Sequence, residues 1–487
     1  MANVNRPTEG PMSPGGEFPE LAGMTRRESL RNGAKLVLAA GIGSQIMAAT
    51  GAETAVARQV RSVAARAGNK PGYGPLVAKG PFKLPKGFEV FEFGKAGSPM
   101  SDGLRTPKHH DGSAVFKAHG RRLTLIRNQE NAGHGKALSK HNAYDRHAKG
   151  GVTTSLFDTK KGELVGSSLV LNGTDNNCNG GKTPWGTWLS CEESTVGKFK
   201  GYEKEHGYVF EIPHGARSPI DPKPIKAMGR FVHEACAVDP RTGIVYMTED
   251  NGPDGFYRYV PNHRGQLHRG GRLEMLCVNG RSKYDTVTGQ KVGKKLRCEW
   301  VTIDDPDPED AERHSTRVYD QGRDKGAARF MGLEGASWGQ GSVWFTASEA
   351  GDIHRGQVWR YTPSKHLKHG TLQLVYESSN RARLDQPDAI VVSPRGGVLL
   401  GEDGDGEDRD GGTNNLRVLT PAGKMETFAV NSTPLDLHRY EGEKKGTVGR
   451  SEWSGACYSP DGKWLFVHIQ IPGITYAITG PWEKGWL

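Results

Sequence analysis

The chain of 487 residues has few cysteines, no dense run of one charge and almost no helical periodicity. Each of these absences excludes a class of protein. Six cysteines without a CxxC pair do not make a disulfide scaffold. The net charge of +10 comes from scattered basic residues, without a helix-turn-helix, zinc-finger or aromatic RNA-binding motif. We therefore expect no nucleic-acid partner, and the positive charge suits small phosphate-bearing molecules as well.

Glycine, proline and tryptophan are abundant, with 67, 28 and 10 residues, as is typical of short strands joined by tight turns. β-Branched and aromatic runs bounded by turn residues predict strands. The clearest of these runs are residues 207–212, 244–248, 341–346, 357–361, 397–400 and 463–467. Residues 237–243, 391–397 and 457–463 repeat one pattern, a strand, a turn with proline and glycine, and a second strand.

This recurrence predicts an all-β fold, a β-propeller with loop insertions, because four-stranded blades must pack radially to bury both faces. At about 40 to 70 residues per blade, the chain holds six or seven blades. No linker divides residues 82–487, which we interpret as a single propeller domain. A pair of β-sandwiches is the structural alternative.

Residues 282–324 are polar and predict a long excursion between strands. Its acidic run, 304–310, suits solvation better than calcium binding. Cys277 and Cys298 flank a predicted hairpin, where they either pair as a disulfide or remain buried thiols on neighbouring strands.

The N-terminal residues 1–57 have the layout of an extension with a twin-arginine signal peptide. Arg26 and Arg27 precede a weakly apolar stretch, 36–49, and a small-residue cleavage site at 55–57. Ser29 departs from the pattern, which has a large apolar residue there, and an amphipathic helix of the mature protein is the alternative. Residues 58–81 read as a linker.

The apolar stretch falls short of the ~20 residues of a membrane span, so we expect no stable membrane insertion after processing. The expected partner is the twin-arginine export machinery, and the expected location is the periplasm, cell envelope or extracellular space. That route carries folded proteins, commonly with an inserted cofactor, which favours a metal site in the mature chain.

Acidic residues and one loop cysteine lie at predicted strand ends, where the loops of a propeller converge. Thiolates favour iron, zinc or copper, whereas carboxylates suit calcium, magnesium or ferric iron. A structural cysteine with solvated glutamates is the alternative interpretation. The candidate metal ligands are Cys178, Glu193, Glu234, Glu249, Asp250, Glu334, Asp388, Glu402 and Asp403.

Four segments, 183–193, 229–235, 246–250 and 458–473, resemble the PhoX-type alkaline phosphatases. The resemblance implies a six-bladed propeller that hydrolyses phosphate monoesters with iron (Fe³⁺) and calcium as cofactors. It implies that Cys178 is the iron-binding thiolate and that Glu193, Glu249 and Glu334 are shared between iron and calcium. The remaining candidates would bind calcium or orient the other ligands.

The resemblance breaks at Gly332, because the family commonly has arginine there, which holds the substrate phosphate. Arg329, or else Arg323, is the candidate replacement. The implied reaction is metal-assisted hydrolysis, in which cations neutralise the phosphoryl oxygens and an oriented water attacks in line. The rival is a calcium-stabilised propeller that binds a ligand or protein, or hydrolyses another ester or a lactone.

The twin-arginine interpretation predicts that replacing Arg26 and Arg27 by lysine together will trap the protein in the cytoplasm, because export depends on the paired guanidinium groups. Cell fractionation with immunodetection measures the outcome. Normal amounts of processed protein outside the cytoplasm would show that residues 1–57 are not such a signal.

Overall fold

The computed structural model describes residues 70, 72–404, 414–432, 435–436, 448–449 and 451–487. The chain divides into Met1–Gln45 and Ile46–Leu487, and every described residue belongs to the second unit. The predicted signal, with Arg26 and Arg27, lies outside the described residues, as do residues 58–69 of the predicted linker. Among the helices described, none is long and apolar enough to cross a membrane.

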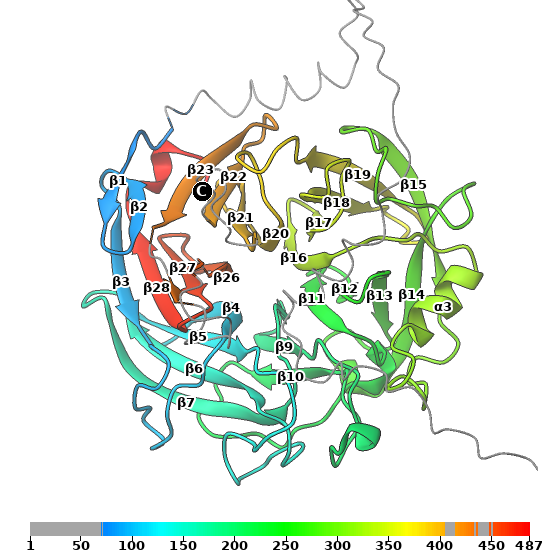
Figure 1. The fold of residues 1–487 in the computed structure, drawn as a ribbon, viewed down its shortest axis with the longest axis horizontal. Helices are drawn as coiled ribbons and strands as arrows, with labels where there is room; N and C mark the ends of the chain where they lie inside the picture. The colour runs from blue at the N-terminus through cyan, green and yellow to red at the C-terminus, as the bar shows by residue number, and fades with distance from the viewer. Residues whose placement is uncertain (1–69, 71, 405–413, 433–434, 437–447, 450) are drawn as a thin grey trace, which may run out of the picture. The chain divides into compact units, whose positions relative to one another are not determined.

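The described part of the second unit is a β-propeller of six blades, each an antiparallel sheet whose first strand lies next to the axis (Figure 1). Blade 1 consists of β4 (His110–Lys117), β5 (Arg122–Gln129), β6 (Gly150–Asp158) and β7 (Glu163–Thr174). Blade 2 consists of β8 (Gly181–Lys182), β9 (Thr187–Cys191) and β10 (Val209–Pro213). Blade 3 consists of β11 (His233–Val238), β12 (Val245–Glu249), β13 (Phe256–Pro261) and β14 (Gly271–Val278).

Blade 4 consists of β16 (Leu333–Gly339), β17 (Ser342–Ala347), β18 (Gln357–Pro363) and β19 (Gly370–Glu377). Blade 5 consists of β20 (Pro387–Val392), β21 (Val398–Glu402), β22 (Asn415–Leu419) and β23 (Met425–Asn431). Blade 6 consists of β26 (Trp453–Tyr458), β27 (Trp464–Ile469), β28 (Ile474–Thr479) and β3 (Glu89–Phe93).

Strands from the N-terminal side close the ring. β3 pairs with β28, so blade 6 combines the two ends of the propeller sequence. β1 (Leu76–Lys79) pairs with β2 (Phe82–Pro85), and β2 extends blade 5 by pairing with β23. β1 lies inside the segment predicted to be a linker, so the sheet begins before residue 82. Pairing chain ends in this way leaves no open gap between first and last blade.

Six clusters of buried apolar side chains form the core of the described residues, one at each interface between neighbouring blades. Successive side chains on a strand point to opposite faces, and both faces of a blade are covered. On β21, Leu399 therefore packs toward blade 6 and Leu400 toward blade 4. Burying one such side chain stabilises the fold by about 1.5 to 3 kcal/mol.

The inner strands of neighbouring blades run side by side around the axis. Their spacing requires very small residues at particular points. At Gly112 on β4, a Cβ atom would overlap the backbone carbonyl of Asn179 in blade 2. The glycine thus permits blades 1 and 2 to approach at the end of the axis where the acidic residues lie.

The structure confirms the propeller and the strands predicted from sequence, and it excludes the sandwich alternative. The prediction for residues 282–324 is wrong in part. They contain β15 (Lys295–Thr302), which pairs with both β14 and β19, and the helix α3 (Arg317–Asp324). Burial alternates over the first four residues of β15, and pairing on both sides stabilises a strand that its polar composition does not indicate. Cys277 and Cys298 are buried free thiols on the neighbouring strands β14 and β15.

Smaller described elements lie outside the blades. They are β24 (Leu435–Asp436), β25 (Val448–Gly449) and the 3-10 turns Lys198–Lys200, Lys226–Met228, Leu267–Arg269 and Trp482–Lys484.

Gly112→Ala should lower the free energy of unfolding by about 1 to 3 kcal/mol, because the added methyl group meets backbone that cannot move independently. Gly215→Ala is the matched control, since a Cβ there meets nothing within 4 Å and no positive φ restricts it. Thermal unfolding of both variants measures the difference. Equal melting temperatures would contradict the account of close blade approach.

Candidate metal centre

Acidic or amide side chains stand at the beginning of the inner strands. Asp111, Glu234, Glu334 and Asp388 are each the second residue of an inner strand, and Asn179 immediately precedes Gly180 and β8. In β4, β11, β16 and β20 the strand register shifts at this point. Such bulges redirect a side chain from the sheet face. The carboxylates consequently gather at one end of the axis.

The second strands of blades 2, 3 and 5 end in paired acidic residues. Successive side chains point to opposite sides, and in blades 2 and 5 the second member, Glu193 or Asp403, lies among the groups of possible metal ligands. The first member turns away and accepts hydrogen bonds from a residue in the third strand or immediately before it. The pairs are Glu192-Glu193, Glu249-Asp250 and Glu402-Asp403.

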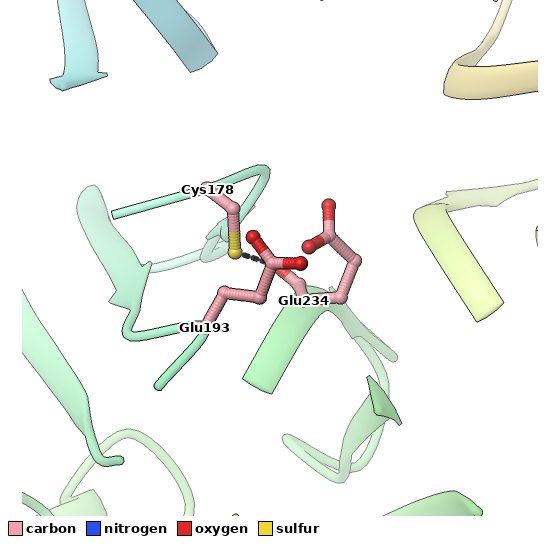
Figure 2. A group of neighbouring side chains, drawn as sticks. All are labelled: Cys178, Glu193 and Glu234. Carbon is pink, nitrogen blue, oxygen red and sulfur yellow. Dashed lines mark hydrogen bonds between the residues drawn. The ribbon is translucent and has the colours of Figure 1, made fainter. Parts of the chain in front are cut away.

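Figure 2 shows the group formed by Cys178, Glu193 and Glu234. One ligand atom from each residue lies within 4.8 Å of the others. Cys178 is buried, and its Sγ lies 3.0 Å from the carbonyl oxygen of His233 and 3.2 Å from that of Glu234. The amide of Asn128 donates to the Cys178 carbonyl and so holds the cysteine loop against blade 1. A thiol and two carboxylates from three separate segments thus converge on one point.

Three further groups continue from this one among the residues that the structure describes. They share members, because Glu234, Asp388 and Glu452 each belong to two groups. The result is a continuous row of ligand atoms that draws on all six blades, and we call it the acidic row. Its further groups are Glu234–Glu334–Asp388, Asp388–Asp403–Glu452 and Asp111–Glu130–Glu452.

Neutral side chains orient the carboxylates of the acidic row. Asn179 Nδ2 donates to Glu234 at 2.7 Å and to Asp388 at 2.9 Å. Asn176 Nδ2 donates to Glu193 at 2.9 Å, and Ser348 Oγ donates to Glu334 at 2.8 Å. Gln470 joins the far end by donating to both Glu130 and Glu452. Partners of this kind fix the direction in which a ligand oxygen points.

The electrostatics of the row fit bound cations. Burial raises the pKa of Cys178 well above its usual 9, and the charges of Glu234 and Glu193 raise it further. A thiolate here therefore requires a neighbouring cation. Carboxylates at this spacing also repel one another unless a cation or proton compensates. The oxygen donors suit hard cations, and the single sulfur suits a transition metal.

The structure brings six of the predicted ligands into the acidic row and leaves three outside its groups. Those in the row are Cys178, Glu193, Glu234, Glu334, Asp388 and Asp403. Those outside are Glu249, Asp250 and Glu402.

Glu249 and Glu402 lie outside because strand alternation turns them into the blades. Glu249 accepts from Tyr257 Oη at 2.7 Å, and burial raises its pKa well above the usual 4.5. Glu402 accepts from Arg417 Nε at 2.7 Å, and burial raises its pKa to about 7 despite that guanidinium. Asp250 lies near Asp254, whose pKa rises to about 7 through burial and the charge of Asp250.

The sequence interpretation missed Asp111, Glu130 and Glu452, which complete the far end of the row. A signal for Asp111 existed, because Asp111-Gly112 repeats the pattern of Glu334-Gly335, an acidic residue followed by glycine at a strand start. Glu130 follows β5 and Glu452 precedes β26, so both stand at strand ends like the predicted ligands.

The structure directs neither replacement arginine to the acidic row. Arg329 Nη1 forms an ion pair with Asp285 at 2.8 Å, and Arg323 Nη1 donates to the carbonyl of Ala327 at 2.8 Å. Gly332 itself has no room for a side chain. Its φ is +60°, and a Cβ would lie 2.6 Å from Ser348 Oγ and 2.8 Å from Glu349 N. An arginine at this position therefore strains the backbone that carries Glu334.

An axial cavity of about 360 Å³ lies beside the row. Inner-strand residues of every blade line it, among them Val115, Cys236, Trp338 and Val391. Asn179 also lines the cavity while it donates to Glu234 and Asp388, so it lies where the cavity meets the row.

Several solved structures align with this chain, and Pseudomonas fluorescens PhoX shares its fold. Pseudomonas fluorescens PhoX, in complex with vanadate, a transition state analogue, is 18% identical and aligns with a TM-score of 0.61 over 84% of this chain and 97% of that chain. A gluconolactonase from Xanthomonas campestris is 11% identical, with a TM-score of 0.38 over 84% of this chain and 98% of that chain. A comparison with curated proteins found no match.

The family model described as alkaline phosphatase PhoX matches residues 166–473. This match covers more than half of the chain and includes most of the acidic row, from Cys178 to Glu452. The chain therefore belongs to the PhoX family of alkaline phosphatases, which are metal-dependent phosphoric monoester hydrolases.

Proposed function

We propose that this chain hydrolyses phosphate monoesters outside the cytoplasm, at a centre that binds iron through Cys178 and calcium through the carboxylates that continue from it. The observation that carries the proposal is the Cys178–Glu193–Glu234 group. It provides one thiolate ligand at the end of an otherwise oxygen-only row, in a chain of the PhoX family.

The assignment of metals follows from the donors. Iron accepts both thiolate and carboxylate, so the group of Cys178, Glu193 and Glu234 would hold it. Calcium prefers six to eight oxygen ligands and tolerates irregular geometry, which suits Asp388, Asp403 and Glu452. Glu234 belongs to the groups on both sides and takes the bridging role that the sequence interpretation gave to Glu249.

Side chains of this protein orient the carboxylates that would bind the metals beside the substrate. When bound, the metals act as Lewis acids that neutralise charge on the phosphoryl oxygens. Asn179 and Asn176 keep the carboxylates turned toward the row, so that the ligand oxygens need not reorganise during the reaction. The vanadate complex of Pseudomonas PhoX supports phosphoryl transfer as the reaction class.

Because Gly332 stands where the PhoX family commonly has arginine, we expect this chain to hydrolyse phosphate monoesters more slowly than a relative with that arginine. A charge-assisted contact made in the transition state contributes on the order of 2 to 4 kcal/mol, a factor of roughly 30 to 1000 in rate. Among the described residues, the Arg329 and Arg323 side chains bind elsewhere, so metal ions would carry the neutralisation of the phosphate.

Export in the folded state agrees with how the acidic row is assembled. Its ligands come from blade 1, with Asp111, through blade 6, with Glu452, so the row forms only when the ring has closed. We propose that Arg26 and Arg27 direct this metal-loaded chain to the twin-arginine machinery. A signal read on a folded protein allows metal insertion to precede export.

For protein purified after native export, we predict that Cys178→Ser removes iron and lowers kcat/KM on an aryl phosphate monoester by about 100-fold or more, because a metal ligand is lost. Cys457→Ser is the matched control, because Cys457 is also a buried thiol but lies at the interface of blades 6 and 1, 3.3 Å from Ser113 Oγ. Elemental analysis and steady-state kinetics measure both effects.

Glu249→Ala separates the role of a metal ligand from a structural role. It should leave the iron content unchanged while lowering the melting temperature, because it removes the carboxyl oxygen that accepts from Tyr257 Oη and from the Gly255 amide inside blade 3. Full iron and activity in Cys178→Ser would overturn the metal assignment. Wild-type protein with its metals bound that hydrolyses a lactone but no phosphate monoester would overturn the proposed function.

A further inference from the structure

Blade 6 and blade 1 meet through an apolar interface that becomes polar toward the acidic row. On each of the strands β5, β27 and β28, an apolar and a polar residue lie two positions apart and therefore on the same face of the strand. The polar residue is the one nearer to the acidic row. The apolar members belong to the core cluster between these blades. The three pairs are Leu125 and Arg127 on β5, Phe466 and His468 on β27, and Ala477 and Thr475 on β28, where the polar residue comes first in the sequence.

Arg127 is buried here without a carboxylate partner. Its side chain is 2% exposed, and no ion pair to it exists among the described residues. Nη1 donates to Thr475 Oγ1 at 2.5 Å, and Nε donates at 3.2 Å to Gln129 when that amide takes its better orientation. Burial lowers the pKa of Arg127 to about 9, without a compensating carboxylate.

Burial, and then the charge of Arg127, lowers the pKa of His110 and of His468 well below 6.5. Both histidines have buried ring nitrogen atoms without partners among the described residues. His468 is fully buried, and neither Nδ1 nor Nε2 has a hydrogen-bond partner in the described part of the chain. His110, also fully buried, packs edge-on at 6.0 Å between ring centroids. Its Nε2 lies 3.1 Å from the Pro107 carbonyl, to which it donates, while Nδ1 has no partner.

A bound water alone would not compensate the buried charge of Arg127. Buried polar atoms normally find a partner, so these nitrogen atoms indicate a molecule between the blades. A water would satisfy hydrogen bonds but would leave the guanidinium charge uncompensated, which is costly in an interior. An anion would compensate this charge, and a single guanidinium beside neutral histidines balances one negative charge.

We propose that Arg127 and His468 bind a small monovalent anion of the halide class between blades 6 and 1. Arg127 and one N–H of His468 donate to the anion. A water on the anion donates to His110 Nδ1, which is an acceptor when Nε2 carries the proton. The anion neutralises Arg127 and stabilises the contact between blades 6 and 1, where His110 immediately precedes Asp111 of the acidic row.

Chloride should stabilise the protein by mass action, because only the closed ring forms the site. We expect a melting temperature at least about 2 °C higher in sodium chloride or bromide than in sodium gluconate of equal ionic strength. Arg127→Met should lose this dependence. Arg122→Met, an exposed residue of the same strand, should retain it and is the matched control.

Equal melting temperatures of wild type in the two salts, or equal chloride stabilisation of Arg127→Met, would overturn the proposal. Should Arg127→Met fail to fold, crystals of the wild type grown in bromide decide it. An anomalous bromide peak between Arg127 and His468 supports the site, and ordered water alone overturns it. None of these measurements uses phosphatase activity, so they stand or fall independently of the proposed function.

Discussion

The crowding of carboxylates at one end of the propeller axis is the constraint on which the rest of the structure depends. Eight acidic side chains and one thiol form four overlapping groups, each with its ligand atoms within 4.8 Å of one another. Like charges this close disfavour the folded state unless cations compensate them. Because the row draws on every blade, cations bound to it stabilise the closed ring, and the closed ring creates the row.

The fold meets this constraint with local features of each blade. Bulges at the starts of β4, β11, β16 and β20 turn one carboxylate per strand toward the axis. Amides such as Asn179 then hold pairs of these carboxylates at fixed positions. Away from the axis, the six interblade clusters supply the apolar burial. The polar features are thus confined to one end of an otherwise apolar ring.

Much of the fold could be predicted from sequence because its signals are local. Continuous apolar runs, such as Val398–Leu400 in β21, indicate strands buried on both faces, and the repeated turns indicate blades. β15 could not be predicted, because its polar sequence forms a strand only between β14 and β19. The closure of blade 6 by β3 depends likewise on pairing between distant segments.

The site could be predicted only as a set of residue types at strand ends. Strand register decides which way Glu249 and Asp250 point, and register cannot be predicted from these two residues. Glu234 reaches the row through a β-bulge that the local sequence does not predict. Asp111 and Glu452 meet only after ring closure. Gly332 looks like a lost arginine in sequence, whereas its positive φ and close neighbours explain the glycine.

The most direct test of the central claim is anomalous diffraction at the iron absorption edge, from crystals of the protein purified with its native metals. The account predicts an iron peak between Cys178 Sγ and the carboxylates of Glu193 and Glu234, with oxygen-coordinated calcium further along the row. Calcium alone throughout the row, with Cys178 bound to no metal, would contradict it.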